Sequence, residues 1–192
     1  RSIWVGLRPL VKPQDDDGDN TKGLSREHTV LVSRSGLVTV TGGKWTTYRA
    51  MAEDVLQHCF DKGLLPARQS GVTEHFRLQG GDGASSQFQS IADAPGLHSY
   101  GSEQVQVLAM PGAGRALAPG LTEAMVRFGA RHECARTVED VLARRSRLLF
   151  LDAGLAREVA PAVAEILQQE TDRDPQLPAF LALADKYLQL PA

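Results

Sequence analysis

Two glycines, a lysine and two threonines stand together at residues 42–47 (GGKWTT), where a β-branched run gives way to a helical pattern. A helix that begins there leaves its first backbone N–H groups without intrahelical acceptors, and the helix dipole makes that end mildly positive. Glycine lets another molecule approach the backbone closely. Lys44 adds a charge, and the hydroxyls of Thr46 and Thr47 add donors. The pattern predicts a site for an anion or an electron-rich ring edge, although an ordinary tight turn gives the same pattern.

Two arginines would complete such a site. Arg8 stands in the apolar stretch GLRPL, where a charge is unexpected unless it has a partner. Arg26 follows an acidic loop and precedes the first expected strand of a hairpin. Guanidinium groups bind phosphate well because their fork matches two oxygens at once. Arg8, Arg26 and Lys44 together predict a phosphate pocket, although Arg26 alone also fits an ordinary surface residue.

A hairpin and a helix must position these residues. Residues 28–43 predict two strands joined by a turn at residues 33–36. From Thr46 the period becomes helical, with Thr46 or Thr47 as the cap and an end near Gly63. The expected apolar face of this helix comprises Tyr48, Met51, Ala52, Val55 and Leu56.

A second part of the chain is expected beyond a linker. Residues 79–86 are rich in glycine and serine, which favour a flexible linker over a helix or strand. After them the apolar residues recur at helical spacing. A capping-box variant begins at Thr137, Pro161 implies a kink or a late start of the next helix, and the last helix starts near Pro178.

The expected fold class is α+β. Residues 1–78 carry a short β-hairpin and a strand–Gly-Gly–helix piece of an incomplete core, and residues 87–192 predict an all-α domain of four or five helices. The chain begins with Arg1 rather than methionine, so we expect a piece of a longer protein. A formal net charge of -2 argues against nucleic acid as a partner. No apolar run is long enough to cross a bilayer.

Three other patterns were considered and favour no site. Cys59 and Cys134, each near a histidine, lack the spacing of a zinc finger or ribbon. The acidic loop at residues 14–23 has Asp15, Asp17 and Asp19 at ligand-like spacing. A calcium-binding loop that begins at Asp15 would need glycine at its sixth position, which is Asn20, and glutamate at its twelfth, which is Arg26. Residues 112–120 (GAGRALAPG) follow no strand and lack the third glycine of a dinucleotide fingerprint, so an interhelical loop is expected there. We therefore expect no metal site.

Five blocks carry a resemblance to a known family. They are GLRPL, SREHTV, TVTGGKWTTYRAMAEDVL, YGSEQVQVL and RTVEDVLARRSRLLFLDA, and they cover nearly the whole chain. The blocks GGKWTTYR and ARRSRLLFLDA are specific enough together that chance is a poor explanation. In this order and spacing the blocks resemble the C-terminal third of FAD-dependent glycerol-3-phosphate dehydrogenases.

The resemblance implies roles for the residues named above. It implies that the helix N–H groups face the pyrimidine edge of the flavin, where negative charge appears on reduction. The implied flavin-side residues are Gly42, Gly43, Lys44, Thr46 and Thr47. The implied ligands of the substrate phosphate are Arg8, Arg26 and Lys44.

The resemblance also implies a reaction and its partners. Hydride would pass from sn-glycerol 3-phosphate to FAD, giving dihydroxyacetone phosphate, and the electrons would go to a membrane quinone. The FAD domain and the general base are expected upstream of Arg1, so no catalytic residue is expected in the chain, which alone would be inactive and would not retain FAD. The implied location is cytoplasmic, peripheral at the inner face of the cytoplasmic membrane. A homodimer is left open.

Two alternatives remain at this point. The related glycerol-3-phosphate oxidase would share the flavin site and pass electrons to oxygen. In a different class, residues 87–192 would form an autonomous helical module for protein interaction or membrane docking. Their arginines mixed with apolar residues fit that module, but a buried face with a charged outer side explains the pattern more simply.

Overall fold

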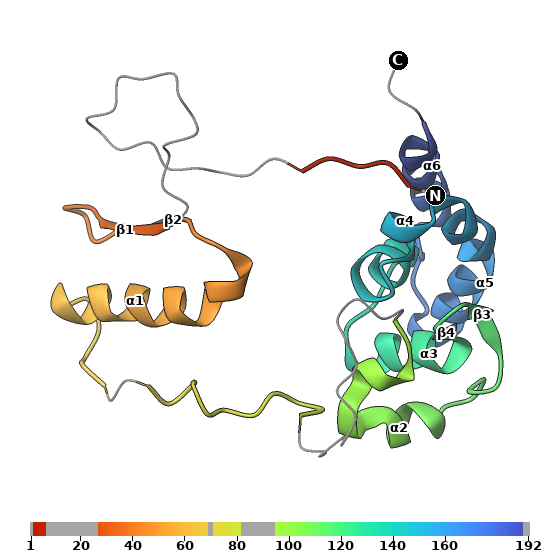
Figure 1. Cartoon of the computed structure of the whole chain (residues 1–192), viewed down its shortest axis with the longest axis horizontal. Coiled ribbons are helices and arrows are strands. Elements are labelled where there is room, and N and C mark those ends of the chain that lie inside the picture. Colours follow the sequence, from red (N-terminus) through yellow and green to blue (C-terminus); the bar gives the residue numbers. More distant parts are fainter. Residues whose placement is uncertain (1, 7–26, 69–70, 82–94, 190–192) are drawn as a thin grey trace. The chain divides into compact units, whose positions relative to one another are not determined.

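The structure is a computed structural model that divides the chain into two compact units, whose elements Figure 1 labels. The first, here called the hairpin–helix unit, is Gly6–Phe76. The second, the helical unit, comprises Arg1–Val5 together with Arg77–Ala192. The residues that the structure describes are 2–6, 27–68, 71–81 and 95–189.

A β-hairpin opens the described part of the hairpin–helix unit. β1 (His28–Val32) and β2 (Val38–Gly42) run antiparallel, and their register places His28 opposite Gly42. The strands are rich in β-branched residues, which pack well on a pleated surface. Both predicted strands and the turn between them are confirmed.

The helix that follows begins at the predicted place. A 3-10 turn, Trp45–Thr47, leads into α1 (Tyr48–Asp61), and the helix ends at Lys62, just before Gly63 with a φ of 67°. Glycine adopts this left-handed conformation without strain, so it suits a helix end. The predicted capping role is wrong, because Thr47 stands at the N-cap position of α1 but its side chain makes no capping hydrogen bond.

The predicted apolar face of α1 is only partly covered. Met51 and Val55 are partly buried, and Cys59, one turn further along this face, is buried. Tyr48 and Leu56 remain 53% and 46% exposed. The helical period therefore identifies the helix correctly, while the hairpin covers only one side of the apolar stripe.

The helical unit confirms the expected helical C-terminal domain. α5 packs against α3, α4 and α6, so it lies at the centre of this unit. A short two-stranded sheet adds to the helices that the sequence predicts. The helical elements are a 3-10 helix (Leu97–Glu103), α2 (Gln104–Leu108), α3 (Glu123–His132), a π-helical segment (Asp140–Arg145), α4 (Leu148–Leu151), α5 (Ala153–Thr171) and α6 (Leu177–Leu188).

The helical unit contains the main hydrophobic core of the described residues. Most of its side chains come from α3, the π-helical segment, α4, α5 and α6. Each large apolar side chain that is fully buried contributes about 1.5–3 kcal/mol to folding. The largest of them are Phe128, Phe180, Leu142, Leu149, Ile166 and Leu167.

The capping box at Thr137 is confirmed. The Asp140 N–H donates to the Thr137 hydroxyl (3.1 Å), and the Thr137 N–H donates to the Asp140 carboxylate (2.9 Å). The Arg136 N–H donates to the same carboxylate oxygen (2.9 Å). Burial raises the pKa of Asp140, but these hydrogen bonds outweigh it and hold the pKa below its usual value. The box therefore pairs donors at the start of a helical segment that would otherwise lack acceptors.

Two expectations for this unit are corrected. α5 begins at Ala153 and continues through Pro161, so a late start at the proline is wrong. The start is instead set by Asp152, whose carboxylate accepts from the Leu155 N–H (2.9 Å). The expected interhelical loop at residues 112–120 contains β3 (Ala116–Ala118), which pairs with β4 (Leu121–Thr122). The last helix begins beside Pro178, as predicted.

The N-terminal segment is attached to the helical unit. The Ser2 hydroxyl accepts from the Ala153 N–H (2.8 Å) and donates to the Leu149 carbonyl. The Trp4 ring meets the Phe150 ring edge-on, with centroids 5.6 Å apart. The chain therefore starts in the helical unit, passes through the hairpin–helix unit and returns.

Candidate functional site

A pocket of about 380 Å³ lies beside the start of α1, within the hairpin–helix unit. Its wall combines the beginning of β1, the turn at residues 43–44 and one face of α1. On that face Thr47, Ala50 and Asp54 follow one another at helical spacing. The lining residues are Glu27, His28, Gly43, Lys44, Thr47, Ala50 and Asp54.

The glycine pair forms a left-handed turn. Gly42 and Gly43 have φ values of 77° and 80°, which other residues adopt only with strain. A Cβ atom on Gly43 would lie 2.6 Å from Met51 Sδ and 3.1 Å from His28 Cβ. The missing side chain at Gly43 thus serves the packing of the turn against α1 and β1. The role of Gly43 toward a ligand stays a prediction.

The first turn of the helix carries open donors. The Thr47 N–H and the Thr47 hydroxyl both donate to the Lys44 carbonyl, each at 3.0 Å. Among the residues that the structure describes, no acceptor bonds the N–H groups of Trp45 and Thr46. These two groups lie at the positive end of the helix, so they are suited to hydrogen bonds with an electron-rich ligand.

The predicted site residues are only partly placed. Gly43, Lys44 and Thr47 line the pocket, and Thr46 is exposed beside it in sequence. Arg8 and Arg26 lie outside the described residues, so their approach to Lys44 stays a prediction. The acidic loop at residues 14–23 also lies outside them.

Sequence analysis missed four lining residues of this pocket, and two of them, His28 and Asp54, contact each other. His28 Nε2 lies 2.8 Å from Asp54 Oδ2, so the first residue of β1 is joined to the middle of α1. Because the two residues are 26 positions apart, no local spacing connects them. The one available signal was the hairpin register, which sets His28 opposite the first glycine of the turn.

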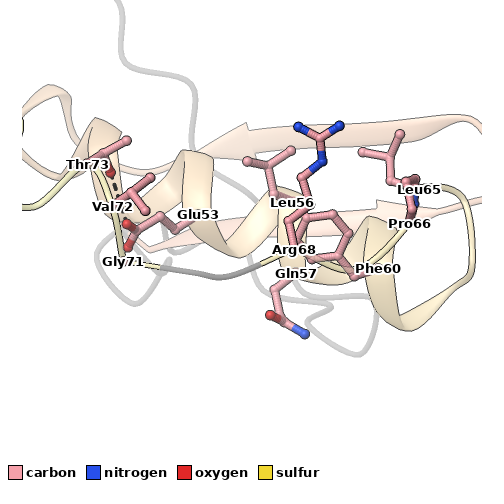
Figure 2. A pocket seen from close by; sticks show the side chains of 10 residues that line it. All are labelled: Glu53, Leu56, Gln57, Phe60, Leu65, Pro66, Arg68, Gly71, Val72 and Thr73. Carbon is pink, nitrogen blue, oxygen red and sulfur yellow. Dashed lines mark hydrogen bonds between the residues drawn. The ribbon is translucent and has the colours of Figure 1, made fainter.

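A second cavity, of about 370 Å³, lies between α1 and the chain segment that follows it (Figure 2). Figure 2 shows the Thr73–Glu53 hydrogen bond at one end of this groove, where the Thr73 hydroxyl donates to the Glu53 carboxylate (3.0 Å), and Leu65 and Pro66 at the other. Leu56 and Phe60 of α1 contribute to its apolar lining. None of the predicted site residues that the structure describes lines it.

A charged cluster in the helical unit joins α3 to α5. Arg127 contacts Glu123 and Glu170, each at 2.5 Å, and Arg131 contacts Glu170 at 2.6 Å. Hydrogen bonds from Arg131 and Arg127 hold the pKa of Glu170 below its usual value, and those from Arg127 and Arg115 do the same for Glu123. Since all these charges are paired with one another, we interpret the cluster as structural.

The described ranges contain neither a metal-binding cluster nor a membrane-spanning helix. No group of three or more histidine, cysteine, aspartate or glutamate side chains there could hold a metal ion. No helix there is both long enough and apolar enough to span a bilayer.

Comparison with known proteins supplies the family. Residues 71–177, more than half of the chain, match the family described as the C-terminal domain of alpha-glycerophosphate oxidase. The chain is 37% identical to the mitochondrial glycerol-3-phosphate dehydrogenase SDP6 of Arabidopsis thaliana. The alignment is 198 positions long and covers 88% of this chain and 31% of that protein.

Two further relatives come from an animal and a bacterium. The mitochondrial glycerol-3-phosphate dehydrogenase of Homo sapiens is 34% identical over 192 residues, covering 90% of this chain and 26% of that protein. Glycerol-3-phosphate dehydrogenase 2 of Mycobacterium tuberculosis is 37% identical over 188 residues, covering 86% and 31%. The chain thus spans about a quarter to a third of the length of these relatives. The resemblance found in the sequence blocks is confirmed, and the chain belongs to the glycerol-3-phosphate dehydrogenase family.

Proposed function

We propose that the chain is part of an FAD-dependent sn-glycerol-3-phosphate dehydrogenase, which oxidises glycerol 3-phosphate to dihydroxyacetone phosphate and passes the electrons to a quinone. One observation carries the proposal: dehydrogenases of this name match 86–90% of the chain, at 34–37% identity. The match is too long to come from the helical C-terminal domain alone. It therefore includes residues of the hairpin–helix unit, where the pocket lies.

The start of α1 fits the electron-rich edge of a flavin. The N–H groups of Trp45 and Thr46 are open donors, the helix dipole adds partial positive charge, and Lys44 lies at the adjoining pocket. Bound FAD supplies a hydride acceptor that no side chain can provide. The role of these residues is to orient the ring edge and to stabilise the negative charge that appears on it. Gly42, Gly43 and Thr47 hold the turn that presents them.

Lys44 is proposed to bind the substrate phosphate, together with Arg8 and Arg26. A lysine ammonium and two guanidinium groups match the charge and the oxygen atoms of a phosphate dianion. Holding the phosphate fixes the distance between the substrate's carbon 2 and the flavin. Substrate binding energy from a group that does not react then serves orientation.

The relatives are much longer than this chain, so we assign some functions of the enzyme to this chain and the others to the rest of the protein. Residues 1–78 would complete a flavin and substrate core, residues 79–86 would link it to the helical domain of residues 87–192, and the rest of the enzyme would supply the FAD domain and the general base. Residues 1–192 alone are then inactive and do not retain FAD. We propose a peripheral location at the cytoplasmic face of the membrane, where a quinone is within reach. The oligomeric state of the enzyme is left open, with a homodimer as one alternative.

A glycerol-3-phosphate oxidase is the second candidate, because the matching family is described from an oxidase. It would use the same site residues and differ in the acceptor of the electrons. The pocket at α1 concerns substrate and flavin, so it does not separate the two enzymes.

The test uses the full-length protein that contains this chain. We expect it to copurify with FAD, to lose the absorbance of oxidised flavin when glycerol 3-phosphate is added without oxygen, and to recover it with a soluble quinone. Recovery with oxygen and release of hydrogen peroxide would instead identify the oxidase. If no flavin copurifies, or if glycerol 3-phosphate leaves it oxidised, the proposed function is wrong.

A further inference from the structure

We propose that His28 and Asp54 form a positioning pair for the site at the start of α1. In this proposal Asp54 holds His28 against the glycine turn, and His28 occupies the carboxylate that would otherwise repel an anion in the pocket. The inference rests on the proposed function, because it assigns the pair to the same flavin and phosphate site. Neither residue stood among those that the sequence predicted.

One oxygen of the Asp54 carboxylate is hydrogen-bonded to His28, and the other lies near a second histidine. Oδ2 lies 2.8 Å from His28 Nε2, and Oδ1 lies 3.3 Å from His58 Nδ1. His58 Nδ1 also lies 2.9 Å from the Asp54 backbone carbonyl, one helical turn back. Because an ionised carboxylate only accepts hydrogen bonds, His28 Nε2 is the donor to Oδ2, while His58 Nδ1 donates to the Asp54 backbone carbonyl. This arrangement fixes the tautomer of His28 and the direction of its ring.

His28 packs directly against the glycine turn. His28 lies opposite Gly42 in the hairpin, and its Cβ lies 3.1 Å from the point where a Cβ of Gly43 would be. Met51 Sδ of α1 lies 2.6 Å from the same point. The backbone that leads to Lys44 is thus held between α1 and a side chain that α1 itself anchors through Asp54. If the pair is broken, the first residue of β1 loses its attachment to the helix.

The pair also changes the electrostatics of the pocket. Asp54 and Lys44 line the same cavity, and an unpaired carboxylate there would repel a bound phosphate. The His28 N–H donated to Oδ2 offsets part of that negative charge, and the His58 ring lies beside Oδ1. Glu27 also stands in the wall, so pairing Asp54 with His28 lowers the negative charge that the two acids together present beside Lys44.

A second acid on the same helix provides a matched control. Asp61 accepts a hydrogen bond from the Gln57 side chain at 2.8 Å, the same distance as in the His28–Asp54 pair. Asp61 does not line the pocket. Removing either acid deletes one carboxylate from α1, so a difference between the two variants reports the position of Asp54 in the site.

The experiment compares variants of the full-length protein by three measurements: KM for glycerol 3-phosphate, Kd for FAD from the quenching of flavin fluorescence, and melting temperature. We expect Asp54→Ala and His28→Ala each to raise KM roughly tenfold, the loss of one hydrogen bond to a charged group. The double variant is expected to be no worse than the worse single variant, since both remove one interaction. Asp54→Asn and His28→Gln, which keep an acceptor and a donor, should retain most of the affinity, and Asp61→Ala should leave KM and Kd unchanged.

Several results would overturn the inference. They are an unchanged KM and Kd in Asp54→Ala and His28→Ala, an equal loss in Asp61→Ala, or equal damage from the conservative variants and the alanines. The last two results would mean that the pair matters for stability alone, which the melting temperatures would show. If glycerol 3-phosphate does not reduce the flavin of the wild-type protein, the proposed function itself is wrong. If the wild type is active and the variants keep its KM and Kd, only the proposed role of the His28–Asp54 pair is wrong.

Discussion

Lys44 combines three properties that the proposed phosphate contact needs. It is exposed, it lines the pocket, and it directly follows the left-handed glycine turn. Among the described residues no carboxylate forms an ion pair with it. Its charge is thus available to a ligand, unlike that of Arg127 in the helical unit.

Lys44→Ala in the full-length protein is expected to raise KM for glycerol 3-phosphate. Losing a charge-assisted phosphate contact costs roughly 1.5–3 kcal/mol. Lys62→Ala is the control, because Lys62 is an exposed lysine at the opposite end of α1. Steady-state kinetics of the three proteins decide the matter. Equal KM values in wild type and Lys44→Ala would remove Lys44 from the site.

Gly43→Ala is expected to destabilise the hairpin–helix unit more than Gly63→Ala. Both glycines have positive φ, which costs an alanine roughly 1–2 kcal/mol. Only the Cβ at position 43 meets a neighbour, Met51 Sδ at 2.6 Å, whereas nothing lies within 4 Å at position 63. Forcing extra volume into a packed place adds roughly 1–3 kcal/mol. Urea denaturation of both variants measures the difference, and equal midpoints would contradict the packing role of Gly43.

At the scale of elements, the two units differ in how completely their faces are covered. α5 is surrounded by α3, α4 and α6, and Ala156, Val163 and Leu167 along it are fully buried. By contrast, Tyr48 at the start of α1 is half exposed. The ring of Trp45 stacks on it and is itself 86% exposed. Amphipathic periodicity therefore predicts both helices, but burial depends on the elements that lie against each face.

The charged cluster between α3 and α5 predicts an acid-dependent stability. The folded-state pKa of Glu170 is held below its usual value, so its contribution is fully present above the unfolded value of about 4.3 and is lost as pH falls through the folded value. Glu170→Gln is expected to lower the free energy of unfolding of the helical unit at pH 7 by about 1–3 kcal/mol. In the variant, this free energy should also fall less steeply as the pH is lowered.

Melting curves between neutral and acid pH test this prediction. Glu165→Gln, an exposed acid on the same helix α5, is the control and should change neither the midpoint nor the slope. Parallel pH curves for wild type and Glu170→Gln would show that the ion pairs do not stabilise the contact between α3 and α5.

At the scale of the whole molecule, the chain order and the two units do not coincide. The segment before the hairpin–helix unit belongs to the helical unit, through Ser2 and Trp4. Ser2 closes a contact across 151 positions of sequence by accepting from the Ala153 N–H at the start of α5. The helical unit is therefore completed by residues from both ends of the chain.

Ser2→Ala is expected to lower the melting temperature of the helical unit. The variant leaves the fully buried Ala153 without an acceptor for its N–H, which costs about 1–3 kcal/mol. Ser35→Ala, which removes an exposed hydrogen bond to Ser33 in the hairpin turn, serves as the control. Calorimetry of both variants in the full-length protein distinguishes them. Identical transitions would mean that the N-terminal segment does not support the helical unit.

Much of the local structure could be predicted because it depends on neighbours in sequence. The period-2 run before Gly42, the helical period after Thr46 and the capping box at Thr137 each involve residues a few positions apart. The errors arose where a longer-range environment decided the outcome. α5 accommodates Pro161 because packing on several sides holds a helix that propensity alone would interrupt.

The sequence by itself determined the family, through five blocks along the chain. It also determined the glycine turn before α1 and the position of Lys44 next to it, because these residues lie in one continuous block. Only the tertiary structure decided that His28 meets Asp54, that Gly43 packs against Met51 and that Ser2 completes the start of α5. The physical reason is that a periodic pattern specifies which face of an element is apolar, whereas a contact between distant residues depends on how the chain folds back and which partner then lies within reach of a hydrogen bond.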